Sequence, residues 1–169
     1  MNARRRFLKT GIAGALLLAT AGAAWRLARP SAPAGTAALD DGARQVLAAI
    51  VPVILAGVLR PGTADVAAAV ERTAVAVAGL PLDTQQEIRD LFALLTLAPA
   101  RRLLAGVPGG WSKARPEDVA AFLQSWRLHR VKLLRSAYQA LHDLVAGPWY
   151  AHESSWTAIG YPGPLKELS

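Results

Sequence analysis

Cysteine is absent from this chain of 169 residues, and methionine occurs once. Without cysteine the chain cannot build a disulfide framework or ligate an iron–sulfur cluster through thiolates. It also cannot attach a haem through a Cys-x-x-Cys-His motif. The sequence therefore excludes electron transfer by this chain on any of those cofactors.

Strand patterns are lacking as well. No segment alternates apolar and polar residues over the length of a strand, and no Asn-Gly or Asp-Gly turn is flanked by such alternation. Several segments instead repeat apolar residues at helical spacing, and no internal repeat is present. The sequence predicts an all-α fold, a single small helical bundle preceded by a signal helix.

Acidic residues are missing from the first 39 positions, and this distribution explains the net charge of +7. Six of the nineteen Lys and Arg residues precede residue 31, which leaves thirteen basic against twelve acidic residues in the remainder. The body is thus close to neutral. Nucleic acid is not expected as a partner, because its binding requires a basic face.

The basic start of the chain reads Ala3-Arg4-Arg5-Arg6-Phe7-Leu8-Lys9. An uncharged stretch, rich in Ala, Gly and Leu, follows over residues 10–25. A basic head before an apolar segment is typical of an export signal. The opening closely resembles the twin-arginine signal: Arg4 and Arg5 form the pair, and Phe7, Leu8 and Lys9 follow after one spacer. Ala3 replaces the usual Ser or Thr, and the resemblance implies export of an already folded protein by the twin-arginine translocase.

Three regions follow from this interpretation: a signal peptide or anchor over 1–27, a Pro/Ala-rich linker over 28–38 and a helical domain over 39–169. Cleavage could follow either of two small-x-small triplets in 19–23, and a leader that stays in the membrane remains an alternative. So does a basic N-terminus followed by an ordinary buried helix. The apolar stretch 11–24 is shorter than a spanning helix needs. We expect a periplasmic protein that touches the membrane only through its signal segment.

Helix starts and stops divide the domain. Pro52 should bend or split the first helix near Ile50, Gly147-Pro148 should end the longest one, and Trp126 should lie in the core. The expected elements are helices over 40–59, 64–78, 83–97, about 116–145 and 149–159, with a short turn at 101–104.

No catalytic constellation is recognisable. The histidines at 129, 142 and 152 lack the spacing of three or four that lets two imidazoles on a helix share a metal. Surface or capping roles are expected for them. Ser154 and Ser155 lack a nucleophile-elbow setting, and the carboxylate pairs at 40–41 and 117–118 are explained by helix capping. We therefore expect no catalytic, cofactor-binding or metal-binding residue in this chain, which is not predicted to be an enzyme.

Aromatic residues gather in the last third of the chain. Trp and Tyr are favoured at interfaces because they combine apolar area with a hydrogen-bonding end. The short terminal segment cannot bury all of its aromatic residues beneath itself, so we expect a partner interface there. Packing of the same residues onto the bundle stays open as the alternative. The predicted interface residues are Trp149, Tyr150, Trp156, Ile159, Tyr161, Pro162 and Pro164.

The C-terminal stretches resemble a known family. They are Leu123-Gln124-Ser125-Trp126 through Arg135, then Ala146-Gly147-Pro148-Trp149-Tyr150, and finally Ser155-Trp156-Thr157-Ala158-Ile159-Gly160-Tyr161-Pro162-Gly163-Pro164. Together with the leader and the helical body they are similar to gluconate 2-dehydrogenase subunit 3, the small subunit of flavin-dependent dehydrogenases. The resemblance implies a large partner subunit of the glucose–methanol–choline oxidoreductase type, which holds FAD and performs the chemistry. A cytochrome c or another carrier often takes the electrons in such complexes.

On this resemblance the chain is a non-catalytic accessory subunit that supplies the export signal and stabilises the flavoprotein. It differs from typical secreted small subunits in having no cysteine, so a disulfide to the partner is ruled out. Two alternatives stay open. One is a free-standing exported helical binding or envelope protein without a dehydrogenase partner, and the other is an enzyme whose distant side chains meet in the fold.

Overall fold

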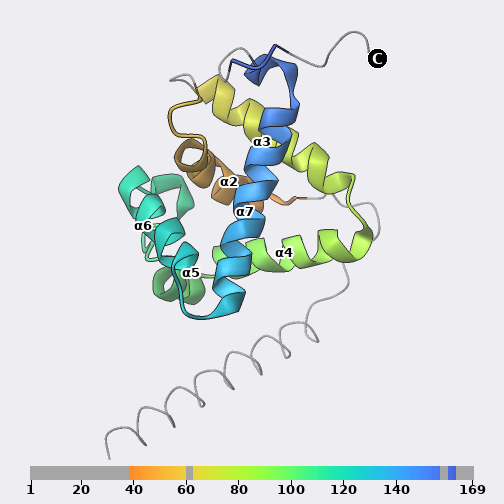
Figure 1. The fold of residues 1–169 in the computed structure, drawn as a ribbon. Coiled ribbons are helices and arrows are strands. Elements are labelled where there is room, and N and C mark those ends of the chain that lie inside the picture. Colours follow the sequence, from red (N-terminus) through yellow and green to blue (C-terminus); the bar gives the residue numbers. More distant parts are fainter. Residues whose placement is uncertain (1–38, 60–62, 157–159, 163–169) are drawn as a thin grey trace, which may run out of the picture. The chain divides into compact units, whose positions relative to one another are not determined.

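Helices make up the part of the chain that the computed structural model describes, which is residues 39–59, 63–156 and 160–162 (Figure 1). No strand occurs within these ranges, so the predicted all-α class is confirmed. None of the helices in these ranges is long and apolar enough to cross a bilayer. The elements are α2 (Asp41–Ile54), α3 (Thr63–Ala78), α4 (Leu82–Thr96), α5 (Ala98–Leu104), α6 (Pro116–Arg127) and α7 (Lys132–Ala151), with 3₁₀ turns η1 (Trp111–Lys113) and η2 (Glu153–Ser155).

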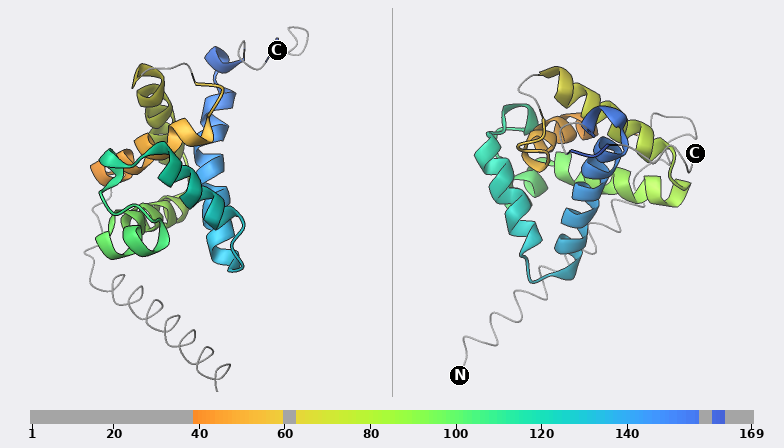
Figure 2. Two further views of the ribbon diagram at one scale, coloured as in Figure 1. Left: turned by 90° about the vertical axis from the view of Figure 1, so that its left-hand side faces the viewer. Right: turned by 45° about the horizontal axis from the view of Figure 1, so that its top comes forward.

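Helix α2 forms the centre of the bundle, because it contacts α3, α4, α6, α7 and η1 (Figures 1 and 2). Its apolar residues recur at the spacing of one helix face, and four of them are completely buried: Val46, Leu47, Ile50 and Val51. Helix α7 packs against α3 and α6 and completes the enclosure. The hydrophobic core therefore surrounds one central helix.

The start of α2 is fixed by a cap and by a close approach. The carboxylate of Asp40 accepts a hydrogen bond from the backbone N–H of Ala43 at 2.7 Å. A Cβ atom added to Gly42 would lie 2.9 Å from Cγ2 of Thr96, at the end of α4. Glycine is thus required here for the packing of two helix ends.

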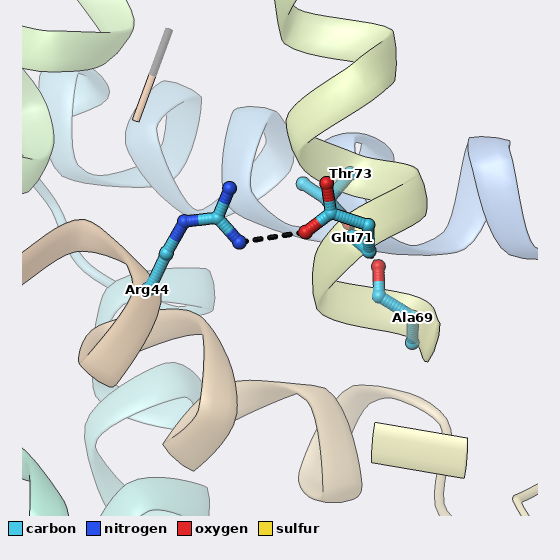
Figure 3. Close-up of polar contacts among 4 residues, drawn as sticks. All are labelled: Arg44, Ala69, Glu71 and Thr73. Atoms are coloured by element: carbon cyan, nitrogen blue, oxygen red, sulfur yellow. Dashed lines mark hydrogen bonds and ion pairs between the residues drawn. The ribbon is translucent and has the colours of Figure 1, made fainter. Parts of the chain in front are cut away.

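A surface ion pair joins α2 to α3. Nη1 of Arg44 lies 2.7 Å from Oε2 of Glu71 (Figure 3). On the same helix α3, the hydroxyl of Thr73 is completely buried and donates to the carbonyl of Ala69 at 2.9 Å. The buried polar group is therefore satisfied within its own helix, and the ion pair contributes little because both side chains are exposed.

Of the bend or split expected near Ile50, the split does not occur, because α2 runs through Pro52 as one helix; it ends at Ile54 rather than at about Leu59. A proline inside a helix removes one hydrogen bond, here to the carbonyl of Ala48. Both Pro52 and Ala48 lie on the exposed side of α2, so water can satisfy that carbonyl. The helix continues because its buried face is uninterrupted.

The predicted helix over about 116–145 is wrong, since the structure has two helices there, α6 and α7. Nδ1 of His129 accepts from the N–H of Val131 at 3.1 Å, and Nη1 of Arg135 donates to the carbonyls of His129 and Arg130 at 2.7 and 3.2 Å. These side chains replace helical backbone bonds and turn the chain. No glycine or proline marks the turn, and Val131 within it is exposed.

The predicted stop at Gly147-Pro148 is also wrong, because α7 continues to Ala151. Leu141, Val145 and Trp149 follow one another at intervals of four and are all buried. Burying the indole of Trp149 in the same stripe outweighs the single hydrogen bond that Pro148 removes. Within the separate helix expected over 149–159, the structure places the end of α7 and η2 up to Ser155, and residues 157–159 lie outside the described residues.

An aromatic cluster closes the side of the core formed by η1 and α6. Phe122 contacts Trp111 and Trp126 edge to face, with ring centroids 5.7 and 4.8 Å apart. Both indole N–H groups donate to backbone carbonyls, Trp111 to Leu95 at 2.8 Å and Trp126 to Leu104 at 3.1 Å. The prediction that Trp126 is a core residue is confirmed, with 2% of its surface exposed.

Candidate functional site: the aromatic C-terminal segment

The predicted interface residues divide by exposure. Trp149 is 6% exposed, whereas Tyr150 is 38% and Tyr161 47% exposed. Trp156 is half-buried and Pro162 is exposed. We call Tyr150, Trp156, Tyr161 and Pro162 the aromatic surface; it lies at the C-terminal end of α7.

Trp149 does not belong to this exposed surface, and its burial agrees with the alternative that it packs onto the bundle. The indole lies between α7 and α3, where the guanidinium carbon of Arg72 is 4.8 Å from the ring centroid. That distance permits a cation–π interaction. Trp149 therefore packs within the chain because α7 extends past Pro148, which the sequence pattern did not indicate.

Hydrogen bonds within the turn order η2, and one further bond joins it to α3. Nη2 of Arg72 donates to the hydroxyl of Ser154 at 3.1 Å. Nδ1 of His152 accepts from the N–H of Ser154 at 3.2 Å, which caps the start of η2. The buried hydroxyl of Ser155 donates to the carbonyl of His152 at 2.7 Å. The turn after α7 is thus fixed by its own residues and by one arginine from α3.

Trp156 and Tyr161 form the outer part of the aromatic surface. Their ring centroids are 5.3 Å apart at an interplanar angle of 82°, an edge-to-face contact. The N–H of Tyr161 donates to the carbonyl of Trp156 at 2.9 Å, and Nε1 of Trp156 donates to the carbonyl of Tyr150 at 3.2 Å. The rings of Trp156 and Tyr161 therefore hold defined positions next to the end of α7, which favours binding because little of their side-chain freedom is left to lose.

Two buried donors beneath the aromatic surface have no acceptor among the described residues. They are Nη1 of Arg72 and Nε1 of Trp149. A buried donor without an acceptor costs about 1–3 kcal/mol, and native proteins rarely leave such groups unpaired. Hydrogen bonding at this end of the bundle is therefore incomplete within the described ranges, in contrast to the paired indoles of Trp111 and Trp126.

Sequence reasoning missed Arg72, which connects α3 to both Trp149 and η2. The residue stands in an Ala-rich helix, far from Trp149 in the chain, and no local motif marks it. Only its position on the face of α3 that meets α7 gives it this role.

The histidines occupy the surface and capping positions expected of them. His129 and His152 each accept a backbone N–H beside a helix start, and His142 lies 3.2 Å from the carboxylate of Asp143. The pKa of Asp143 is lowered, first by a hydrogen bond from Gln139 and second by the one from His142. No cluster of three potential metal ligands occurs among the described residues.

Ser154 and His152 resemble a nucleophile and its base in distance alone, with Oγ 3.0 Å from Nδ1. The same Nδ1 accepts the backbone N–H of Ser154, and the hydroxyl accepts from Arg72. Helix capping accounts for this geometry. The aromatic side chains and hydrogen-bond donors at this end of α7 are suited to binding another protein.

Comparison with protein-family models, with characterised proteins and with solved structures gives no match. The family suggested by the leader and tail therefore stays a prediction. The residues predicted as the export signal, Arg4, Arg5, Phe7, Leu8 and Lys9, lie outside the described residues, as do the linker 28–38, Ile159 and Pro164.

Proposed function

We propose that this chain is the non-catalytic small subunit of a periplasmic flavin-dependent dehydrogenase that acts on sugars or alcohols. The observation that carries the proposal is the pairing, in one chain, of a twin-arginine-like start at Arg4-Arg5 with the tail Trp156 to Pro164. The start resembles a signal for folded cargo, and the tail resembles that of the small subunits of such enzymes.

The leader has a reason to be present only if something large is exported with the chain. A small helical protein with mostly local contacts folds fast and gains little from a translocon for folded cargo. A flavoprotein that acquires FAD before export does require one. In this proposal the small subunit supplies the signal at Arg4-Arg5, and the large subunit crosses the membrane with it.

The aromatic surface supplies the docking site in this proposal. Tyr150 and Tyr161 are exposed at 38% and 47%, and their backbone positions are fixed by hydrogen bonds to Trp156. Exposed, ordered aromatic residues are the kind of side chain that dominates binding energy at protein interfaces. The orphan donors of Arg72 and Trp149 lie next to this surface.

The two subunits have separate roles in this proposal. The large subunit of the glucose–methanol–choline oxidoreductase type holds FAD and reacts with the substrate, and a cytochrome c or another carrier receives the electrons. This chain contributes export and stabilises the flavoprotein through contact. No residue of this chain is given a chemical step.

Isolation of the native complex tests the proposal. The chain is recovered from a periplasmic extract with an antibody, because a tag at either end would touch the leader or the tail. We expect a large, yellow flavoprotein in stoichiometric amount. A colourless monomer would overturn the proposal and favour the free-standing helical binding or envelope protein instead.

A further inference from the structure

Apolar side chains are exposed in the turn between α6 and α7. All residues from 127 to 133 are exposed. Leu128, Val131 and Leu133 expose 70%, 51% and 74% of their surfaces. We call residues 127–135 the basic tip.

The basic tip holds a defined conformation. Arg135 donates to the carbonyls of His129 and Arg130 at 2.7 and 3.2 Å, and His129 accepts the N–H of Val131 at 3.1 Å. These bonds satisfy backbone groups that would otherwise require water. The apolar side chains beside them are therefore presented outward by an ordered turn.

Positive charge surrounds these apolar side chains. The tip contains Arg127, Arg130, Lys132 and Arg135, and no Asp or Glu occurs anywhere from residue 119 to residue 142. The nearest acid along α6 is Asp118, about 14 Å from Arg127 at a rise of 1.5 Å per residue. The nearest acid along α7 is Asp143, about 12 Å from Arg135 on the same measure. Although the net charge of residues 31–169 is close to zero, the end of the bundle that carries the basic tip is therefore positively charged.

Helix α5 adds to this end of the bundle. Its last residue, Leu104, accepts the hydrogen bond of Trp126 from the last turn of α6 at 3.1 Å. Leu103, beside it, is 85% exposed, and Arg102 is exposed as well. No acid occurs from residue 91 to residue 116, so α5 supplies no counter-charge to the tip.

From these features we infer that the basic tip binds the surface of an anionic phospholipid bilayer, which adds a second membrane contact to the single one expected from the signal segment. Cationic side chains are attracted to anionic headgroups, and exposed aliphatic side chains gain by entering the boundary with the acyl chains. Nucleic acid would use the cations but would leave Leu128 and Leu133 in water, and the tip has no Phe, Tyr or Trp for base stacking. Its one aromatic ring, His129, already accepts the backbone N–H of Val131. The mixture of the two side-chain types therefore favours a membrane.

The tip and the aromatic surface lie at opposite ends of α7, which runs from Lys132 to Ala151 (Figure 1). A helix of that length spans about 30 Å at 1.5 Å per residue. Membrane contact at one end therefore leaves the other end free for a partner protein. The inference does not depend on the identity of that partner.

Vesicle binding tests the inference. The purified chain is sedimented with vesicles of phosphatidylglycerol and phosphatidylcholine, or with vesicles of phosphatidylcholine alone. The leader is either present in all the proteins compared or absent from all of them. R127Q/R130Q/K132Q should weaken binding to the anionic vesicles by about five-fold for each cation removed, and L128S/L133S should weaken it by at least about ten-fold. Binding should also fall as salt rises.

The matched control is V75S/L82S, which removes two apolar side chains exposed at 66% and 74% on α3 and α4. Helicity and thermal melting should be unchanged in all three variants, because the altered side chains are exposed. Three results would overturn the inference: equal binding to the two kinds of vesicle, equal loss in the control, or binding to nucleic acid that exceeds binding to the anionic vesicles.

Discussion

The guanidinium carbon of Arg72 lies 4.8 Å from the ring centroid of Trp149, and Nη2 of the same arginine donates to Ser154 at 3.1 Å. One side chain of α3 thus holds both the end of α7 and the turn that follows it. The aromatic surface rests on this arrangement, because Tyr150 follows Trp149 directly and Trp156 donates to its carbonyl.

Replacing Arg72 by Met should lower the free energy of unfolding by about 1 kcal/mol, because the lost cation–π contact and charged hydrogen bond together outweigh the relief of its buried donor, Nη1, which has no acceptor among the described residues. Urea denaturation measures the change. The control is Arg89→Met, whose guanidinium bonds Gln86 within α4 at 3.0 Å and which should cost under about 0.5 kcal/mol. Equal losses in the two variants would contradict the role assigned to Arg72.

Replacing Trp149 by Phe should cost less stability than replacing Trp126 by Phe. Both changes shrink a buried ring, but Trp126 also loses its bond to Leu104, whereas Trp149 loses a donor that has no acceptor among the described residues. The difference in unfolding free energy should be at least about 1 kcal/mol. Equal costs would show that the N–H of Trp149 is paired in the folded chain.

Replacing Gly42 by Ala should lower the free energy of unfolding by about 1 kcal/mol, although alanine favours helices. The reason is that the new Cβ would lie 2.9 Å from Cγ2 of Thr96. Thr96→Ser removes that methyl group and keeps the hydroxyl that donates to Ala93. When Thr96→Ser is already present, Gly42→Ala should therefore be neutral or stabilising, and a persistent loss there would refute the steric explanation.

Replacing Tyr161 or Trp156 by Ala should weaken binding of the proposed flavoprotein partner by more than about 1 kcal/mol each. Titration calorimetry with the separated subunits measures the affinity. Leu82→Ala serves as the control, because Leu82 is also exposed but lies at the start of α4. A lower melting temperature of the isolated chain with unchanged binding would instead assign both aromatic residues to the bundle.

The apolar periodicity of the sequence identified most helices and the central core. The buried stripe of α2 and the burial of Trp126 follow directly from spacing. Three boundaries did not follow from it: the end of α2, the break between α6 and α7, and the end of α7. The break at 128–131 depends on hydrogen bonds between the backbone and the side chains of His129 and Arg135. Such bonds cannot be recognised in a sequence as a Gly or Pro helix breaker can.

The candidate site was predictable only in part. The exposure of Tyr161 agrees with a terminal segment too short to bury its aromatic residues. Trp149 could not be separated from that group, because Gly147-Pro148 is usually a helix stop and the tertiary gain from burying the indole lies outside any local pattern. Its contact with Arg72 joins residues far apart in the chain. The basic tip was not predicted from the net charge of the body, because a net charge does not show where the individual charges lie in the fold.

The central claim is that this leader exports a flavoprotein as well as its own chain. The most direct measurement is the location of that flavoprotein, determined by fractionation and immunoblotting, in strains that carry R4K/R5K or the charge-matched control R6K. The account predicts that R4K/R5K leaves the flavoprotein folded, yellow and cytoplasmic, whereas R6K leaves it periplasmic. Normal periplasmic flavoprotein in the R4K/R5K strain would contradict the account.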